Sequence, residues 1–215
     1  MFEDRTEAGR KLAARLGSGL DRAAVVLALP RGGLPVAAEI ARTLRLPLDL
    51  MLVRKVGLPG HAELALAAIA GPEGEEMVIN EEVARSTGLN HADIRRLAVP
   101  EVAELKRRRT LYLGDRPAVP LTGRTVILVD DGIATGATML AAIRSVRKAS
   151  PSRIILAVPV APADTLATLR SEVDEIVCLD VPPSFYAVGA HYHHFPQVSN
   201  LEVTQILAAF APPPP

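Results

Sequence analysis

The sequence predicts an α/β fold in which helices cover both faces of a parallel, doubly wound sheet of about five strands. Short apolar runs that suit buried strands alternate along the chain with segments whose apolar residues have helical spacing. Such alternation is typical of parallel βαβ units with right-handed crossovers. Hydrophobic residues make up 49% of the 215 positions, whereas aromatic residues make up 3% and Trp is absent. We therefore expect a core of Ala, Val, Leu and Ile, which suits helices layered on a sheet.

The N-terminal part of the chain predicts a helix, a strand and a second helix, in that order. Residues 4–16 carry apolar side chains at every fourth position with charges between them, which predicts an amphipathic helix that covers the sheet. The apolar run 24–29 predicts a strand, and apolar residues with helical spacing follow at 34–41. Further apolar runs predict strands at 48–53, 63–70 and 77–80.

The second half of the chain continues the alternation. Residues 81–109 are charged and carry an intermittent apolar stripe, which predicts helix. Four apolar residues at 126–129 predict a buried strand, and the apolar positions within 139–148 predict the helix after it. The remaining elements are a strand at 154–160, a helix at 162–169 and a strand at 175–179.

The length suits one domain, and we expect residues 1–211 to form it. Its core is expected at about 22–180, with a charged helical segment at about 81–120. A small hood is expected at about 182–205, where the N-terminus can join it. The four prolines 212–215 cannot continue a helix and are expected to form a disordered tail.

The charge balance argues against several classes of partner. Lys and Arg number 24, as do Asp and Glu, so no global field attracts nucleic acid or an anionic membrane. The N-terminus is charged and has no apolar leader segment, and no stretch approaches the ~20 apolar residues of a membrane span. We therefore expect a cytoplasmic protein that binds neither nucleic acid nor membranes.

Residues 126–138, VILVDDGIATGAT, form the most informative stretch. A predicted strand ends in Asp130 and Asp131, and a loop of small residues then enters a helix near Gly136. The N–H groups at such a helix start lack intrahelical partners and suit a phosphate. Carboxylates beside a phosphate would repel a bare anion, so we expect a ligand that also carries hydroxyls or a divalent metal. No Gly-Lys-Ser/Thr follows, which excludes a Walker-type P-loop.

A second strand–loop–helix contains Arg31, Gly32 and Gly33. Parallel strands end at one edge of a sheet, so Arg31 and the loop amides can converge on an anion beside the first motif. An isolated Arg-Gly-Gly would be explained equally well by an ordinary turn. Arg54 and Lys55 follow the next predicted strand, where they form either a solvated strand end or a pair of cations for the same anion.

The stretch 126–138 resembles the phosphoribosyl pyrophosphate (PRPP) motif of the type I phosphoribosyltransferases. It has the four hydrophobic residues, the two acids and the Gly/Ala/Thr-rich loop that ends in Thr-Gly-x-Thr. The loop 30–33 resembles that family's pyrophosphate loop, which often contains a non-proline cis peptide. The resemblance implies Mg²⁺-dependent transfer of the phosphoribosyl group from PRPP to a nitrogen base, with release of pyrophosphate. PRPP and a nucleobase would be the small-molecule partners, and a homodimer is a possible assembly.

The resemblance also implies roles for individual residues. Asp130 and Asp131 would bind the ribose hydroxyls, near an indirectly held Mg²⁺. The 5′-phosphate would be bound by Ile133, Ala134, Thr135, Gly136, Ala137 and Thr138. The pyrophosphate would be bound by Arg31, Gly32, Gly33, Arg54 and Lys55. Arg31 and Lys55 would join the two aspartates as the catalytic residues. The family's flexible lid corresponds to the segment at about 81–120, which contains Arg107, Arg108 and Arg109.

The segment 182–203 is rich in aromatic residues and histidines. His191 and His193 would share one face of a strand, but no third ligand at metal-site spacing accompanies them, which disfavours zinc. The stretch resembles the base-binding region of the 6-oxopurine phosphoribosyltransferases, which implies Phe185, Tyr186 and Val188 as base-binding residues. It lacks the Tyr-Gly-Leu-Asp part of that pattern, so the base stays open, with a purine favoured over a pyrimidine.

Two interpretations from other classes remain. A non-catalytic PRPP sensor would keep the phosphate loop, although the chain shows no appended helix-turn-helix. A regulatory or partner domain that handles phosphoribosyl compounds together with another protein would also fit the motif.

Overall fold

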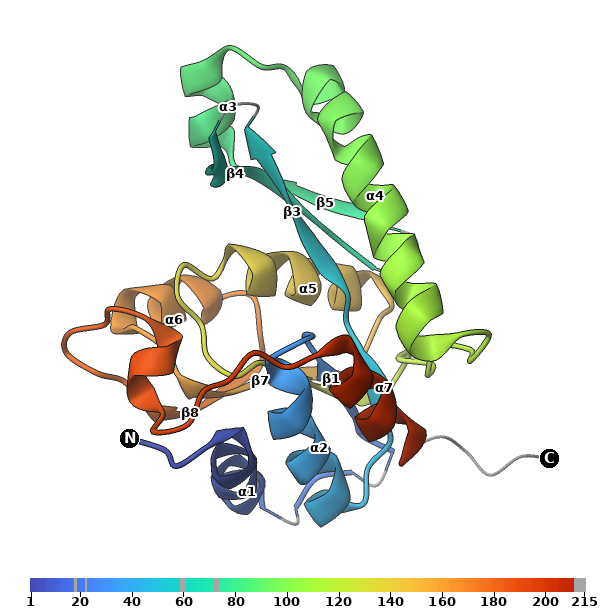
Figure 1. Ribbon diagram of the computed structural model, residues 1–215, viewed down its shortest axis with the longest axis vertical. Coiled ribbons are helices and arrows are strands. Elements are labelled where there is room, and N and C mark those ends of the chain that lie inside the picture. Colours follow the sequence, from blue (N-terminus) through green and yellow to red (C-terminus); the bar gives the residue numbers. More distant parts are fainter. Residues whose placement is uncertain (18, 22, 59–60, 72–73, 211–215) are drawn as a thin grey trace.

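The computed structural model describes all residues except 18, 22, 59–60, 72–73 and 211–215. The tail expected at 212–215 therefore lies outside the described residues. The main sheet has five parallel strands in the order β2-β1-β6-β7-β8 (Figure 1), which confirms the predicted α/β fold class. These strands are β1 (Val25–Ala28), β2 (Leu48–Leu50), β6 (Thr125–Val129), β7 (Arg153–Val160) and β8 (Glu175–Asp180).

Strands β1 and β6 lie side by side within this sheet. They pair in parallel from Val25 with Val126 to Ala28 with Val129. Every residue of both strands is buried, and strands covered on both faces have continuous apolar sequences. Because the two strands are parallel, the loops that follow Ala28 and Val129 leave the sheet at the same edge. The two loops singled out in the sequence are therefore neighbours.

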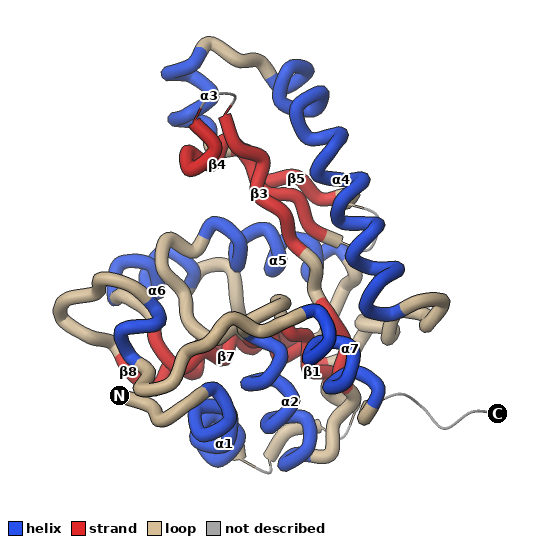
Figure 2. The backbone as a smooth tube through the Cα atoms, viewed as in Figure 1, coloured by secondary structure: helices blue, strands red, loops and turns tan. Residues whose placement is uncertain are grey.

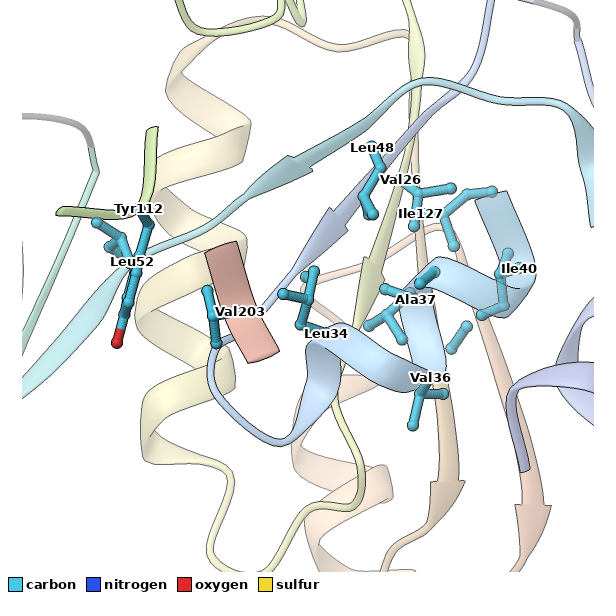
Figure 3. Close-up of a cluster of buried hydrophobic side chains, with 14 of the residues drawn as sticks. Val26, Leu34, Val36, Ala37, Ile40, Leu48, Leu52, Tyr112, Ile127 and Val203 are labelled. Carbon is cyan, nitrogen blue, oxygen red and sulfur yellow. The ribbon is translucent and has the colours of Figure 1, made fainter. Parts of the chain in front are cut away.

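Helices cover both faces of the sheet (Figures 1 and 2). Helices α1 (Arg5–Leu16) and α2 (Gly33–Leu44) lie on one face, and α5 (Ala137–Lys148) and α6 (Ala163–Leu169) lie on the other. On the α2 face, Leu34 and Ile127 belong to one buried cluster (Figure 3). On the α5 face, Leu128, Met139 and Ile143 belong to a second cluster. Full burial of one such aliphatic side chain contributes ~1.5–3 kcal/mol.

A small antiparallel sheet beyond α5 forms the hood (Figure 1). Its strands are β3 (Val53–Leu58), β4 (His61–Ala70) and β5 (Glu76–Ile79), in the order β3-β4-β5. We expected the hood at about 182–205, but the antiparallel sheet that forms it is built from residues 53–79. Apolar runs show that strands exist, but the partner of each strand depends on contacts between distant residues.

The apolar run 48–53, predicted as one strand, is divided between the two sheets. Strand β2 ends at Leu50, and β3 begins at Val53, which pairs with Ala70 of β4. Arg54 and Lys55 therefore lie within an antiparallel strand and not at the end of a parallel one. The apolar run does not stop at the break because Met51 and Leu52, which link the two strands, are themselves buried, so composition carried no sign of the break.

The segment predicted as one helix at 81–109 forms two, α3 (Glu81–Thr87) and α4 (His91–Leu113). Gly88 ends α3 in a left-handed conformation with a φ of 69°, and Asn90 begins α4 with a capping box. Four buried residues of α4 face the hood sheet and the C-terminal helix α7 (Asn200–Ala208): Ile94, Ala98, Leu105 and Tyr112. Most of 81–120 is thus packed helix.

The N-terminus joins the segment that precedes α7. Phe2 forms a parallel bridge with Tyr192. The Phe2 N–H donates to the His191 carbonyl, and the His193 N–H donates to the Phe2 carbonyl, both over 2.8 Å. The short 3₁₀ helix η1 (Val188–His191) lies in this segment. Among the described residues, no helix has both the length and the apolar character that a membrane crossing requires.

Candidate active site

The loop between β6 and α5 forms a cradle of backbone N–H groups. Gly136 precedes α5 with a φ of 77°, a conformation that glycine adopts without steric cost. Within the described part of the chain, the N–H groups of residues 134–138 have no hydrogen-bond acceptor. The positive end of the α5 dipole lies at the same place. A pocket of about 100 Å³ opens here, lined by the loop together with Lys55 and Asp130. The geometry suits a phosphate.

Ile133 differs from the other residues predicted to bind phosphate. Its residue surface is 4% exposed, and its N–H donates to the Val160 carbonyl over 3.0 Å. The Ile133 N–H is therefore bound to β7 and is not available to a phosphate. Ile133 anchors the loop, and the prediction that it binds the phosphate is corrected. A second anchor comes from α6, where the Thr165 hydroxyl donates to the Ala134 carbonyl over 2.7 Å.

The two acids that follow β6 have different surroundings. Burial, followed by the charge of Asp131, raises the pKa of Asp130 well above its ordinary value. Asp131 has a cation beside it, because Arg5 Nε donates to Asp131 Oδ2 over 2.7 Å. The Asp131 N–H donates to Asp130 Oδ1 over 2.8 Å, which fixes the two acids relative to each other.

The loop 30–33 packs directly against both acids. A Cβ atom at Gly32 would lie 2.0 Å from Asp131 Oδ2, and one at Gly33 would lie 2.8 Å from the Asp130 Cα. Neither position has room for a side chain. The peptide bond between Pro30 and Arg31 is cis, as is common in the pyrophosphate loop that this segment resembles. The two predicted loops are thus in contact.

The cations predicted to bind pyrophosphate divide into two groups. Lys55 is exposed and lines the cradle pocket, while the Arg31 side chain makes no hydrogen bond or ion pair with any described residue. Arg54 is instead bound to Glu101 of α4, with 2.8 Å between Nε and Oε2. Consecutive residues of a strand point to opposite faces, so Arg54 and Lys55 cannot both face the cradle. The prediction for Arg54 is corrected accordingly.

The arginines predicted as lid cations are not brought to the cradle. Arg107 and Arg108 both donate to Glu104, over 2.7 and 2.8 Å, and they lower the pKa of that carboxyl to about 2. Arg109 is half-buried, and its Nη2 approaches the Arg116 carbonyl at 3.5 Å. These arginines stay away from the cradle because the apolar stripe of α4 packs the helix against the hood sheet and α7.

The structure also separates the three residues predicted to bind the base. Val188 is close to the acids, since a Cβ at Gly132 would lie 2.5 Å from Val188 Cγ1. Phe185 stacks on His191 with ring centroids 5.5 Å apart. Tyr186 is 95% exposed and therefore lines no enclosed site, so its predicted contact with a base is not supported by the geometry.

Two residues that sequence reasoning missed also touch the acids. Arg5 binds the Asp131 carboxylate, and the Tyr192 hydroxyl donates to the Asp131 carbonyl over 2.6 Å. Burial and the nearby Asp131 charge raise the pKa of Tyr192, which keeps its hydroxyl protonated as a donor. Arg5 lies in no recognisable motif. Tyr192 ends the stretch that resembles a base-binding region, but nothing in that stretch indicates a contact with Asp131.

This geometry can be compared with known proteins. The profile of the phosphoribosyl transferase domain matches residues 4–194. The chain belongs to the type I phosphoribosyltransferase family. The cradle, the paired acids and the loop 30–33 are thus the elements of a phosphoribosyltransferase domain.

Individual relatives agree with this phosphoribosyltransferase assignment. Two proteins of Mycobacterium tuberculosis, from strains CDC 1551 / Oshkosh and H37Rv, carry the provisional name phosphoribosyl transferase. Each is 45% identical over 207 residues, which make up 96% of this chain and 46% of the relative. The chain therefore spans about half the length of these relatives. The solved structure of TT1426 from Thermus thermophilus is 43% identical, with a TM-score of 0.84 over 98% of this chain and 99% of that one.

Proposed function

We propose that the chain transfers the phosphoribosyl group of PRPP to a nitrogen base and releases pyrophosphate. The proposal rests on one observation: unpaired N–H groups, two acids and the Arg31 loop meet at one edge of the sheet, with Gly32 in contact with Asp131. A sugar that carries a phosphate, hydroxyls and a diphosphate would use all three groups of atoms at once.

In the proposed reaction, the base nitrogen forms a bond to C1 of the ribose while the bond from C1 to the diphosphate oxygen breaks. Positive charge then develops on the ring, and carboxylates beside it stabilise that charge. The N–H groups of residues 134–138 would hold the 5′-phosphate, and Asp130 and Asp131 would hold the ribose hydroxyls. Arg31 and Lys55 would meet the negative charge on the departing diphosphate.

The acids fit an Mg²⁺ that is held indirectly. One oxygen of Asp131 is already bound by Arg5, and the described residues contain no group of three His, Cys, Asp or Glu placed to hold a metal. Mg²⁺ commonly keeps several waters and binds substrate phosphates with only one or two carboxylates, so the diphosphate would supply much of its coordination. When bound, it would add positive charge at the leaving group.

Binding of Mg-PRPP is the direct test. At a hundredfold excess over the dissociation constant, ligand binding stabilises the folded state by ~2.7 kcal/mol, which a thermal melt resolves. We expect a clear rise in melting temperature for the wild type and a much smaller rise for the Asp130→Asn, Asp131→Asn double variant. Equal shifts in both proteins would show that the acids do not bind the ligand.

We also propose a purine as the acceptor. The resemblance of 185–192 to a 6-oxopurine site supports this choice, as does the position of Val188 beside Gly132. The test is pyrophosphate release from PRPP with hypoxanthine, guanine, xanthine, adenine, uracil and orotate. Turnover with a pyrimidine alone would reject the purine proposal and leave the transferase proposal intact.

A PRPP sensor is the second candidate, and one observation favours it. Arg54 is paired with Glu101, and Arg107 and Arg108 are paired with Glu104, so fewer cations reach the diphosphate position than the sequence predicted. A sensor would bind Mg-PRPP as above but release no pyrophosphate with any base of the panel.

A further inference from the structure

Arg5 is an almost completely buried cation that reaches the candidate site from the first helix. The residue is 8% exposed, and its partner Asp131 is 126 positions away in the sequence. Burying a guanidinium is unfavourable unless its donors are bound, and here several contacts are made at once. Nε donates to Asp131 Oδ2 over 2.7 Å, and Nη1 donates to the Pro196 carbonyl over 2.8 Å.

The guanidinium also contacts an aromatic ring of the C-terminal segment. Its carbon atom lies 3.7 Å from the centroid of the Phe195 ring, within the range of a cation–π contact. Phe195 in turn lies against Tyr192, with ring centroids 4.8 Å apart, and the Tyr192 hydroxyl donates to the Asp131 carbonyl. Arg5, Phe195 and Tyr192 therefore surround Asp131 from outside the loop that carries it.

These contacts hold the Asp131 carboxylate from two sides. Oδ2 is occupied by Arg5, and the backbone of Gly32 closes the neighbouring side. The Asp131 carboxylate is thus held in one orientation before any ligand arrives. Preorganised groups cost no reorganisation when the ligand binds, and small displacements of such groups are expensive in rate.

We propose that Arg5 is a positioning residue: it orients the Asp131 carboxylate toward the ribose and couples it to the C-terminal segment through Phe195 and Pro196. This inference rests on the proposed function of the same site. It makes the N-terminal segment part of the PRPP site, although that segment lies far from the motif in sequence. A lysine at position 5 would keep the charge but could not donate to Asp131 and Pro196 in the same planar arrangement.

The test compares Arg5→Met and Arg5→Lys with a matched variant on the same helix, Arg10→Met. Arg10 also pairs with an acid, Glu39 at 3.1 Å, but its side chain is 68% exposed. Mg-PRPP affinity is measured by calorimetry on protein whose folding is verified by circular dichroism. We expect Arg5→Met to weaken binding ~10–100-fold, which is typical of losing a hydrogen bond to a charged group. Arg5→Lys should recover part of the loss, and Arg10→Met should bind as the wild type does.

A double-variant cycle separates positioning from a purely structural role. In an Asp131→Asn background, Arg5→Met should cause little further loss of Mg-PRPP affinity, because the carboxylate that it orients is gone. A structural role would instead lower the melting temperature and leave the affinity of the folded protein unchanged. Wild-type affinity in folded Arg5→Met, or full additivity in the cycle, would overturn the inference. If Arg5→Met does not fold, wild-type affinity in folded Arg5→Lys would overturn the inference. Failure of the wild type to bind Mg-PRPP would overturn the proposed function along with it.

Discussion

Replacement of Gly32 by alanine tests the contact between the two loops of the candidate site. Gly32 has ordinary helical angles, a φ of −62° and a ψ of −37°, so alanine causes no backbone strain at this position. The only obstacle is space: the new Cβ would lie 2.0 Å from Asp131 Oδ2 and 2.6 Å from its Cγ. Real Cβ atoms do not approach so closely, and therefore the carboxylate has to move.

The expected magnitude follows from what holds that carboxylate. Asp131 cannot rotate away without breaking its hydrogen bond to Arg5, a pair that is largely shielded from water. Overpacking in such a place costs ~1–3 kcal/mol, which corresponds to a fall of ~2–12 °C in melting temperature for a chain of this size. Because the displaced group is a ribose-binding acid in our proposal, Mg-PRPP affinity should fall as well.

The control and the rescue make this prediction specific. Gly19 is exposed and a Cβ there would meet nothing within 4 Å, so Gly19→Ala should change stability by no more than ~1 kcal/mol. Shortening the acid should relieve the clash, so Gly32→Ala should cost much less stability in an Asp131→Ala background. Equal melting temperatures for Gly32→Ala and Gly19→Ala, or equal costs in the two backgrounds, would refute the reasoning.

Three further predictions concern the cations, the acid pair and the helix α4. Arg31→Ala should lower the rate of pyrophosphate release ~10²–10³-fold, the usual effect of losing one preorganised donor, while ribose 5-phosphate binds as before. Arg54 is bound to Glu101, so Arg54→Ala should have a smaller effect on that rate. The raised pKa of Asp130 means that the folded state binds the proton more tightly, so the stability of the free protein should fall as pH rises above the ordinary value of 3.8. Asp130→Asn should therefore melt at a higher temperature than the wild type near neutral pH and lose that advantage in acid. Limited trypsin digestion should cut at Arg107 at the same rate with and without Mg-PRPP, because α4 packs on the hood; protection by the ligand would restore the lid hypothesis for 81–120.

The parallel sheet and the phosphate cradle could be predicted from the sequence because both depend on local order. The strands of the core are buried on both faces, so each has a continuous apolar run that composition reveals. The cradle lies within one strand–loop–helix, and the thirteen residues that form it are consecutive. The position of the loop 30–33 beside the cradle also followed, because parallel strands end at the same edge of a sheet.

The remaining features of the site depend on tertiary structure alone. Arg54 and Lys55 are equivalent in sequence, and only the pairing of β3 with β4 decided that Lys55 faces the cradle while Arg54 reaches Glu101, 47 positions away. The partner of Asp131 is still more remote, since Arg5 precedes it by 126 positions. Apolar periodicity indicates which face of an element is buried, but it does not indicate which distant element packs against that face. The cation beside the acid was therefore decided by the packing of α1 against the C-terminal segment.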